Sequence, residues 1–226
     1  MAFHALTADT STAHASSWKA RLAISDTHLK VLEAAFFKGR SGPFRDYLGK
    51  FSGRLLILGD GRTVWADYEE YDKSRPFETM AVKLAGAFTP DIHHWAHLHP
   101  EQVPWLRNLR RIRAGRQKGC RVPMYWVHSN KTEELRDSCI PISCQYGGNS
   151  GMFAALVGLS LGYDEITLAG CPSDGEGHYY DPPWVRNDYS HFDQRGQVHN
   201  WEYCRDNLFF GKVKSLSGHT KEWLAT

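Results

Sequence analysis

The sequence has no long hydrophobic run. Its longest apolar stretch, Met152 to Leu161, is shorter than the roughly 20 residues that a membrane-spanning helix needs. The first residues also lack the basic start and the apolar core of a secretory signal peptide. We therefore expect a cytoplasmic protein with no membrane span.

Cysteine is scarce and the net charge is small. The five Cys residues are odd in number and irregularly spaced, so we expect reduced thiols rather than a disulfide framework. A net charge of +2, with His neutral, does not indicate a nucleic-acid partner. One basic run, "RNLRRIRAGRQKG" at Arg107 to Gly119, is either a solvated helix face or a patch for an anionic ligand.

Two kinds of hydrophobic pattern alternate along most of the chain. The run "RLLIL" from Arg54 is apolar after its first residue, as a central parallel strand buried on both faces requires. Strands that alternate with helices predict an α/β fold with a Rossmann-like, mostly parallel sheet and flanking helices. We expect strands at Arg54–Thr63, Thr79–Gly86, Ile92–Pro100, Val122–Ser129 and Glu165–Ala169. We expect helices at Val103–Arg116, Ser150–Leu161 and Asn200–Phe210.

The first 52 residues carry a different pattern. Residues 1–17 have no periodicity and are expected to be flexible at their start. Apolar residues at helical spacing predict a helix within Trp18–Lys38, and a short helix at Phe44–Lys50 follows. We therefore divide the chain into an N-terminal helical extension, 1–52, and a Rossmann-like nucleotide-binding or transferase domain, 53–226.

Two glycine-containing loops are placed to bind a ligand. In an open α/β sheet, ligands bind outside the carboxyl ends of the strands. The loop "GDGRT", Gly59 to Thr63, follows the first expected strand, and its glycines allow either a close backbone approach to a ligand or a tight turn. The loop "YGGNSG" opens a helix that Asn149 or Ser150 can cap, and the same helix start suits an anion.

Three further groups of polar residues are candidates for chemistry. Asp174 and Glu176 are either a pair of divalent-metal ligands or part of a mobile, solvated loop. His191 and His199 are each either a general base near neutral pH or a surface residue. The last group is a histidine run, which is either a metal site or a rim of the ligand cleft, with His99 nearest the ligand. In a strand, side chains alternate between the two faces, so His94 would point to one face and His93, His97 and His99 to the other.

Three segments together resemble a known family. In order, "LLILGDGRTVW", "SGMFAALVGLSLGYDEITLAG" and "SHFDQRGQVHNWEY" are similar to segments of bacterial sialyltransferases, which are GT-A-like enzymes with a single Rossmann-like sheet. Related bacterial and phage proteins, and the archaeal pterin diphosphokinases grouped near them, share the resemblance. It covers about Arg54 to Phe210, and the middle segment is its most specific part.

The resemblance implies a glycosyltransferase that uses a nucleotide-sugar donor and a hydroxyl acceptor and needs no metal. Tyr179 or Tyr180 would contact the phosphate of the nucleotide. His199 would be the general base, with His191 as its rival. The residues implied for nucleotide binding are Gly59, Asp60, Gly61, Asn149, Ser150 and Gly151.

The chain departs from the family pattern at three positions. Asp60 and Lys83 stand where the family carries Asn, and Pro172 stands where it carries Asp. Two other functions stay open. One is a diphosphokinase-like phosphotransferase, which would need a divalent ion on Asp174, Glu176 or Asp60. The other is a nucleotide-binding or interaction protein that has the fold without the chemistry.

Overall fold

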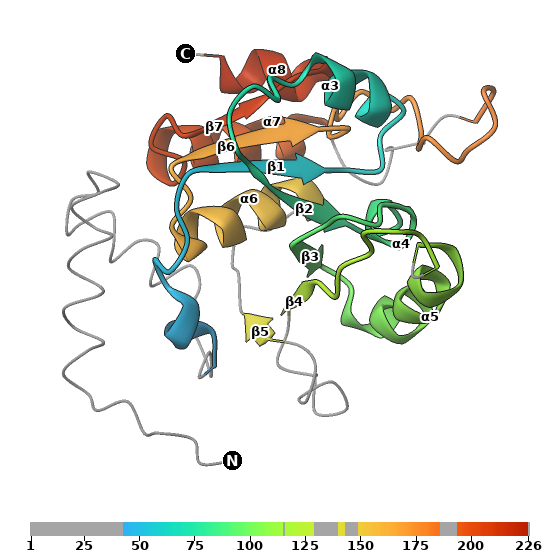
Figure 1. Ribbon diagram of the computed structural model, residues 1–226. Helices are drawn as coiled ribbons and strands as arrows, with labels where there is room; N and C mark the ends of the chain where they lie inside the picture. Colours follow the sequence, from blue (N-terminus) through green and yellow to red (C-terminus); the bar gives the residue numbers. More distant parts are fainter. Residues whose placement is uncertain (1–42, 115, 129–139, 143–148, 186–193, 226) are drawn as a thin grey trace, which may run out of the picture.

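The computed structural model describes residues 43–114, 116–128, 140–142, 149–185 and 194–225 (Figure 1). The helix expected within Trp18–Lys38, most of the N-terminal extension and His191 lie outside these residues. Where the short helix at Phe44–Lys50 is expected, the structure has a 3-10 helix, η1, at Pro43–Tyr47. None of the helices in the described part of the chain is long and apolar enough to cross a membrane.

The described residues form a seven-stranded sheet in the order β5-β4-β3-β2-β1-β6-β7. Each neighbouring pair of strands is parallel, so the sheet is parallel throughout. The strands are β1 Arg54–Leu58, β2 Glu78–Val82, β3 His94–His97, β4 Met124–His128, β5 Ile140–Ile142, β6 Glu165–Ala169 and β7 Val213–Ser215. The helices are α3 Val64–Glu70, α4 Ala85–Phe88, α5 Val103–Arg113, α6 Ser150–Leu161, α7 Gln194–Asn207 and α8 Gly218–Leu224, with a 3-10 helix, η2, at Pro100–Gln102.

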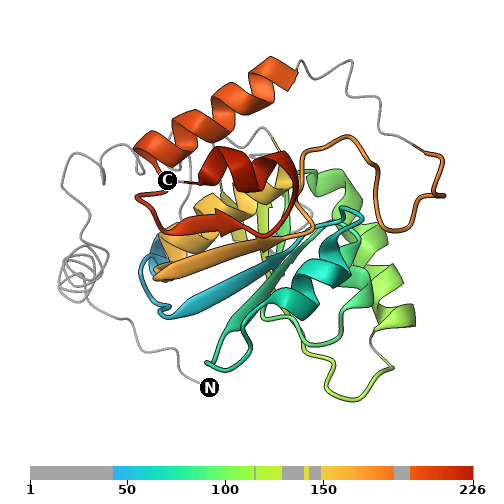
Figure 2. The same ribbon diagram turned by 90° about the horizontal axis from the view of Figure 1, so that it is seen from above.

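The order of the strands reverses beside β1. From β1 the chain builds the sheet outward through β5, then returns and places β6 on the other side of β1. Leu55 of β1 therefore pairs with Glu78 of β2 on one side and with Ile166 of β6 on the other. Such a reversal is where open α/β sheets bind ligands. In Figures 1 and 2, the orange segment after β6 lies at the same end of the sheet as the carboxyl end of β1.

The apolar run of β1 is explained by helices on both faces of the sheet. Leu55 and Ile57 belong to one core cluster, which includes α6 and the buried residues of α7. Leu56 and Leu58 belong to a second cluster, which includes residues of α3, α4 and α5. Since successive side chains of a strand point to opposite faces, a strand covered on both faces buries all of its side chains and is therefore apolar along its length.

Helix α6 lies against the middle of the sheet, and its sequence explains its bounds. All of its residues are buried, so it has no polar face. Gly158 allows its close approach, because a Cβ there would lie 2.6 Å from Leu55 Cδ2. Gly162 ends the helix in a left-handed conformation, φ 106°, and its amide donates to the carbonyls of Gly158 and Leu159.

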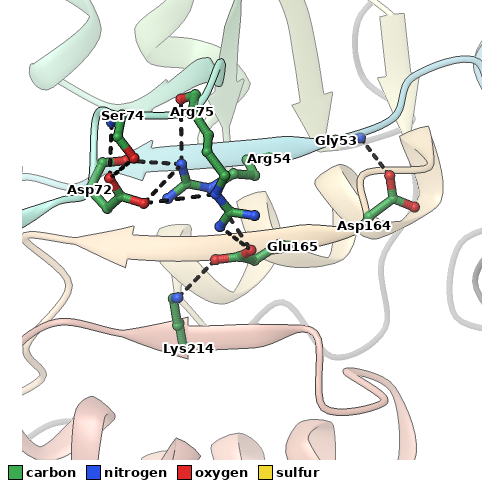
Figure 3. Close-up of polar contacts among 8 residues, drawn as sticks. All are labelled: Gly53, Arg54, Asp72, Ser74, Arg75, Asp164, Glu165 and Lys214. Carbon is green, nitrogen blue, oxygen red and sulfur yellow. Dashed lines mark hydrogen bonds and ion pairs between the residues drawn. The ribbon is translucent and has the colours of Figure 1, made fainter.

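The amino ends of β1, β6 and β7 are fastened by a network of charged side chains (Figure 3). Arg54, only 7% exposed, donates to the carbonyl of Asp72 at 2.9 Å and lies 3.8 Å from the Glu165 carboxylate. Glu165 also accepts from Arg75 at 3.3 Å and from Lys214 at 2.8 Å. These charges therefore stabilise the end of the sheet opposite to the loops that follow β1 and β6.

The structure differs from the sequence-based expectation at several element boundaries. Strand β2 ends at Val82, and the last two residues of the expected strand, Ala85 and Gly86, belong to α4. The chain leaves the strand because Lys83 has a left-handed backbone, φ 44°. Helix α7 begins at Gln194, six residues before the expected start at Asn200. Several short elements were not expected at all, namely α3, α4, β5, β7 and α8.

Candidate functional site

A cavity of about 220 Å³ lies at the carboxyl ends of the strands, beside the reversal point. It brings together the loops after β1, β2, β3 and β6, the start of α6 and one residue of α7. Its lining includes the six residues of the two glycine loops that the family resemblance implies for nucleotide binding: Gly59, Asp60, Gly61, Asn149, Ser150 and Gly151. It also includes residues that the sequence did not single out for binding, among them Lys83, Cys171, Ser173, Gly177 and Gln197.

The glycines of the β1 loop allow two loops to cross. A Cβ on Gly59 would lie 2.2 Å from the carbonyl oxygen of Gly170, and one on Gly61 would lie 2.4 Å from Pro172 Cδ. The amide of Gly61 donates to Gly170 at 2.8 Å. The loop after β6 therefore occupies the space that a side chain at Gly59 or Gly61 would need. This loop forms the floor of the cavity.

Cys171 lies in this floor, packed against Gly59 and Gly151. Its sulfur would be 2.9 Å from a Cβ on Gly151, so the start of α6 packs directly against it. Burial raises the pKa of the thiol to about 12, and the nearby Asp60 and Asp67 carboxylates add to this rise. The thiol therefore stays protonated at neutral pH, whereas the thiolate is the reactive form.

The start of α6 presents polar groups that nothing in the described structure satisfies. Asn149 is the N-cap, and its side-chain oxygen accepts from the amide of Met152 at 2.8 Å. The hydroxyl of Ser150 is buried and has no hydrogen-bond partner among the described residues. Amides in the first turn of a helix have no acceptor within the helix and carry partial positive charge. This is an arrangement suited to an anionic oxygen.

Asp60 lines the cavity but is already engaged by backbone groups. Its carboxylate accepts from the amide of Leu84 at 3.1 Å and from that of Ala85 at 2.7 Å, so it caps the start of α4. Burial raises its pKa to about 6, against the opposing effects of these two hydrogen bonds and of Lys83. Part of the Asp60 population is therefore uncharged just below neutral pH.

The raised pKa of Asp60 makes a prediction for stability against pH. A carboxyl whose pKa is about 6 in the folded state and 3.8 in the unfolded state stabilises the fold fully below pH 3.8, and this contribution is lost as the pH rises through 6. We expect the native protein to lose about 2 kcal/mol relative to Asp60→Asn between pH 4 and pH 7. Urea unfolding at several pH values measures this difference. The exposed Asp46 gives a control, Asp46→Asn. If the difference in unfolding free energy between the native protein and Asp60→Asn changes with pH as little as it does for the control, the raised pKa of Asp60 is contradicted.

The loop after β6 is fixed onto the loop after β1. The guanidinium of Arg62 donates to the carbonyl of Glu176, to that of Pro182 at 2.6 Å and to that of Val185 at 2.9 Å. The amide of Tyr179 donates to Asp60 O at 2.9 Å, and Gly61 pairs with His178 in an antiparallel bridge. Through residue 185, this segment therefore packs on the loop after β1, and its mobility, one of the two expectations, stays a prediction.

The acidic pair of this loop forms a turn. The carboxylate of Asp174 accepts from the amide of Glu176 at 3.0 Å, which is the hydrogen bond of an Asx turn. Among the described residues, no three His, Cys, Asp or Glu side chains are grouped closely enough to hold a metal ion. Asp174 thus takes part in this turn through its carboxylate, and Glu176 through its backbone amide.

His178 and Asp181 form a pair at the wall of the cavity. The Asp181 carboxylate lies 2.9 Å from His178 Nδ1 and also accepts from the His178 amide at 2.8 Å. Since the carboxylate accepts, Nδ1 carries the proton and Nε2 is the basic nitrogen of the neutral ring. The imidazole stacks on Tyr180, with 4.9 Å between ring centroids. The sequence signal for this pair was a His three residues before an Asp, which is too common to single it out.

The two tyrosines expected at the phosphate do not line the cavity. Tyr179 packs against Trp65 and Phe88, and its hydroxyl is buried with no hydrogen-bond partner in the described structure. Tyr180 is 44% exposed and stacks on His178. The structure thus does not bring either hydroxyl to the start of α6, and their proposed role stays a prediction.

His199 lies inside α7 rather than before it. The buried face of α7 carries Trp201 and Cys204, and Gln197, four residues before Trp201, lines the cavity. His199 is two residues beyond Gln197, about 200° further around the helix. Its side chain is accordingly 90% exposed. Because α7 starts early, it directs His199, which the resemblance implies as the base, away from the cavity.

The histidine run does not converge on one point. His99 lines the cavity, as expected of the member nearest the ligand. His94 accepts from the indole of Trp126 at 3.2 Å on one face of the sheet, whereas His97 packs against Trp95 and Tyr125 on the other. Burial lowers the pKa of His97 to about 3, so it is neutral. The run thus contributes one residue to the site and two to the core.

The fold has relatives among solved structures. No family model and no curated protein matches the chain. A single-residue variant of the sialyltransferase CST-II in complex with CMP shares 12% identity over 73% of this chain and 81% of that chain, with a TM-score of 0.50. The sialyltransferase CstII from Campylobacter jejuni, in complex with cytidine-5'-monophosphate, gives 12% identity over 73% and 79%, with a TM-score of 0.49. A mammalian sialyltransferase gives 12% identity over 95% and 87%, with a TM-score of 0.43. The chain has a sialyltransferase-like, Rossmann-type α/β fold.

Proposed function

We propose that this protein transfers a glycosyl group from a nucleotide-sugar donor to a hydroxyl acceptor. The observation that carries the proposal is the buried, unpartnered hydroxyl of Ser150, a residue at the start of α6 that lines the cavity at the strand-order reversal. An unsatisfied buried hydroxyl is costly, and a phosphate oxygen would satisfy both it and the first-turn amides. The CST-II sialyltransferase variant with a similar fold was solved in complex with CMP.

In the proposed reaction, the acceptor oxygen attacks the anomeric carbon of the sugar. The bond between that carbon and the phosphate oxygen breaks, and the leaving nucleotide keeps the electron pair. The start of α6 stabilises the charge that forms on the phosphate. The acceptor hydroxyl gives its proton to a general base as it attacks.

We assign the base to His178 rather than to His199. His178 lines the cavity and its Nδ1–H is directed to Asp181, so Nε2 is the nitrogen that takes up a proton. His199 is directed to solvent. His191 lies outside the described residues and is the second candidate. We further propose that residues 53–226 form the transferase unit, with residues 1–52 as an extension to it.

Nucleotide binding is the first test of this function. We expect one of CMP, UMP, AMP or GMP to raise the melting temperature, because a ligand present at 100 times its Kd stabilises the folded state by about 2.7 kcal/mol. Differential scanning fluorimetry with each nucleotide measures the shift, in EDTA and in Mg²⁺. A shift that requires Mg²⁺ would favour the phosphotransferase, and no shift with any nucleotide at millimolar concentration would contradict nucleotide binding.

The role of Ser150 has a matched control within the same helix. Replacing Ser150 with Ala removes a hydrogen bond to a charged group and is expected to weaken binding of the nucleotide about 10–100-fold. Ser160 is also buried in α6 but lies near its other end, so Ser160→Ala should leave the affinity unchanged. Isothermal titration calorimetry compares the three proteins. Equal losses for both variants would indicate a general effect of loosening α6.

A further inference from the structure

Lys83 has a backbone conformation that its side chain does not favour. It follows β2 directly, and its φ of 44° lies in the left-handed region. Residues other than Gly adopt this region infrequently, and they keep it only where the surrounding structure holds them there. Ser173, with φ 52°, is a second such residue, and both line the cavity. Strained residues of this kind gather at functional sites.

Three hydrogen bonds hold the Lys83 backbone in place. Its carbonyl accepts from the indole of Trp95 at 2.9 Å, and Trp95 is fully buried. The next two amides, of Leu84 and Ala85, donate to Asp60. Gly86 leaves room for the indole, because a Cβ there would lie 2.2 Å from Trp95. The position of Lys83 at the cavity wall is therefore imposed by the core.

The charge of Lys83 has no partner in the described structure. No described carboxylate lies within ion-pair distance of its amine, and no described residue accepts a hydrogen bond from it. Asp60 is near enough to feel its charge, but both Asp60 oxygens already accept from backbone amides. The Lys83 side chain is only partly exposed and shares the cavity with the unpartnered Ser150 hydroxyl. The cavity thus combines an unpaired cation with unpaired hydrogen-bond donors.

We propose that Lys83 binds the phosphate that joins the nucleoside to the sugar. This inference rests on the proposed function and names the residue that neutralises the leaving group. As the bond to the anomeric carbon breaks, its electron pair goes to the phosphate oxygen, and the Lys83 ammonium stabilises that charge while keeping its proton. Lys83 thus takes the phosphate contact that the resemblance implies for Tyr179 or Tyr180, neither of which lines the cavity. A fixed cation at the phosphate also makes a divalent metal unnecessary there.

The test compares nucleotides with their nucleosides. Isothermal titration calorimetry in EDTA gives the affinity of the native protein and its variants for CMP, UMP, AMP and GMP and for the four nucleosides. For the nucleotide that binds, Lys83→Met is expected to weaken binding about 10–100-fold, while Lys83→Arg, which keeps the charge, loses less. Lys118 is exposed and outside the cavity lining, so Lys118→Met is the control and should change nothing.

Lys83→Gly separates charge from structure. Gly favours the left-handed backbone, so this variant should be at least as stable as the native protein and should show the same loss of nucleotide affinity. Native affinity for the nucleotide in either Lys83→Met or Lys83→Gly would overturn the role of Lys83 and leave the proposed function standing. A native protein that binds a nucleoside as tightly as its nucleotide would also overturn it. Failure of the native protein to bind any nucleotide would overturn both.

Discussion

Replacing His178 with Gln is expected to lower the rate of glycosyl transfer by about 10²–10⁴-fold, the usual contribution of a general base. Gln keeps the size and polarity of the side chain but has no basic nitrogen. The loop should keep its position, because Arg62 holds it through backbone carbonyls. Binding of the nucleotide is therefore expected to stay near that of the native protein. Turnover of the nucleotide sugar whose nucleotide binds most tightly measures the first quantity, and calorimetry measures the second.

The matched controls for His178 come from the other two candidate bases. His199→Gln should leave turnover unchanged, because the His199 side chain is 90% exposed on the solvent side of α7. His191→Gln tests the candidate outside the described residues. Asp181→Asn should lower turnover less than His178→Gln and shift the pH–rate profile, since the carboxylate fixes the ring tautomer. A large loss in His199→Gln, with His178→Gln active, would return the role to His199.

Replacing Arg110 with Met should lower the free energy of unfolding by at least about 3 kcal/mol, because it leaves several buried carbonyls without a donor. The Arg110 guanidinium donates to the carbonyls of Gly86 at 2.5 Å, Thr89 at 2.6 Å, Pro90 at 2.8 Å and Arg121 at 2.8 Å. Its side chain also lies over Trp95, 5.8 Å from a ring centroid, so it supports the same buried indole that holds Lys83.

The neighbouring Arg111 provides the control for this change. Arg111 is exposed and, among the residues that the structure describes, donates only to Asn108 of α5, so Arg111→Met should change the free energy of unfolding by no more than about 0.5 kcal/mol. Urea denaturation of the two variants measures the difference. Similar losses in both would show that the helix, and not the buried contacts of Arg110, determines the effect.

Some elements could be predicted from the sequence because local pattern and tertiary environment agree. Helix α6 has an Asn cap at one end, Gly162 at the other and apolar residues between them, and the structure confirms the expected bounds. Strand β6 is likewise confirmed, because Tyr163 and Asp164 separate it clearly from the helix. The fold class follows from such elements, since buried apolar strands alternating with helices leave few other arrangements.

Other features depend on contacts that no local pattern records. Strand β7 has three residues and is a strand because it pairs with β6, where Ile166 lies beside Val213. The basic run of α5 is mostly a solvated face, as one expectation had it. Arg110 within the run is buried, however, and donates to a carbonyl that is distant in the sequence. The glycine loops could be placed in the site from sequence, whereas Lys83 could not, because its position depends on the buried indole of Trp95.

The position of β1 in the sheet has a consequence for how the chain folds as it is synthesised. Arg54 of β1 pairs with Glu165 of β6, so 111 residues must be added before one side of the central strand finds its partner. At typical rates of synthesis this takes roughly 6–22 s. Throughout that time the hydrophobic strand "RLLIL" has one unpaired edge, which is a template for aggregation. Overproduction at lower temperature, or with chaperones that shield nascent strands, is therefore expected to increase the soluble yield of this protein.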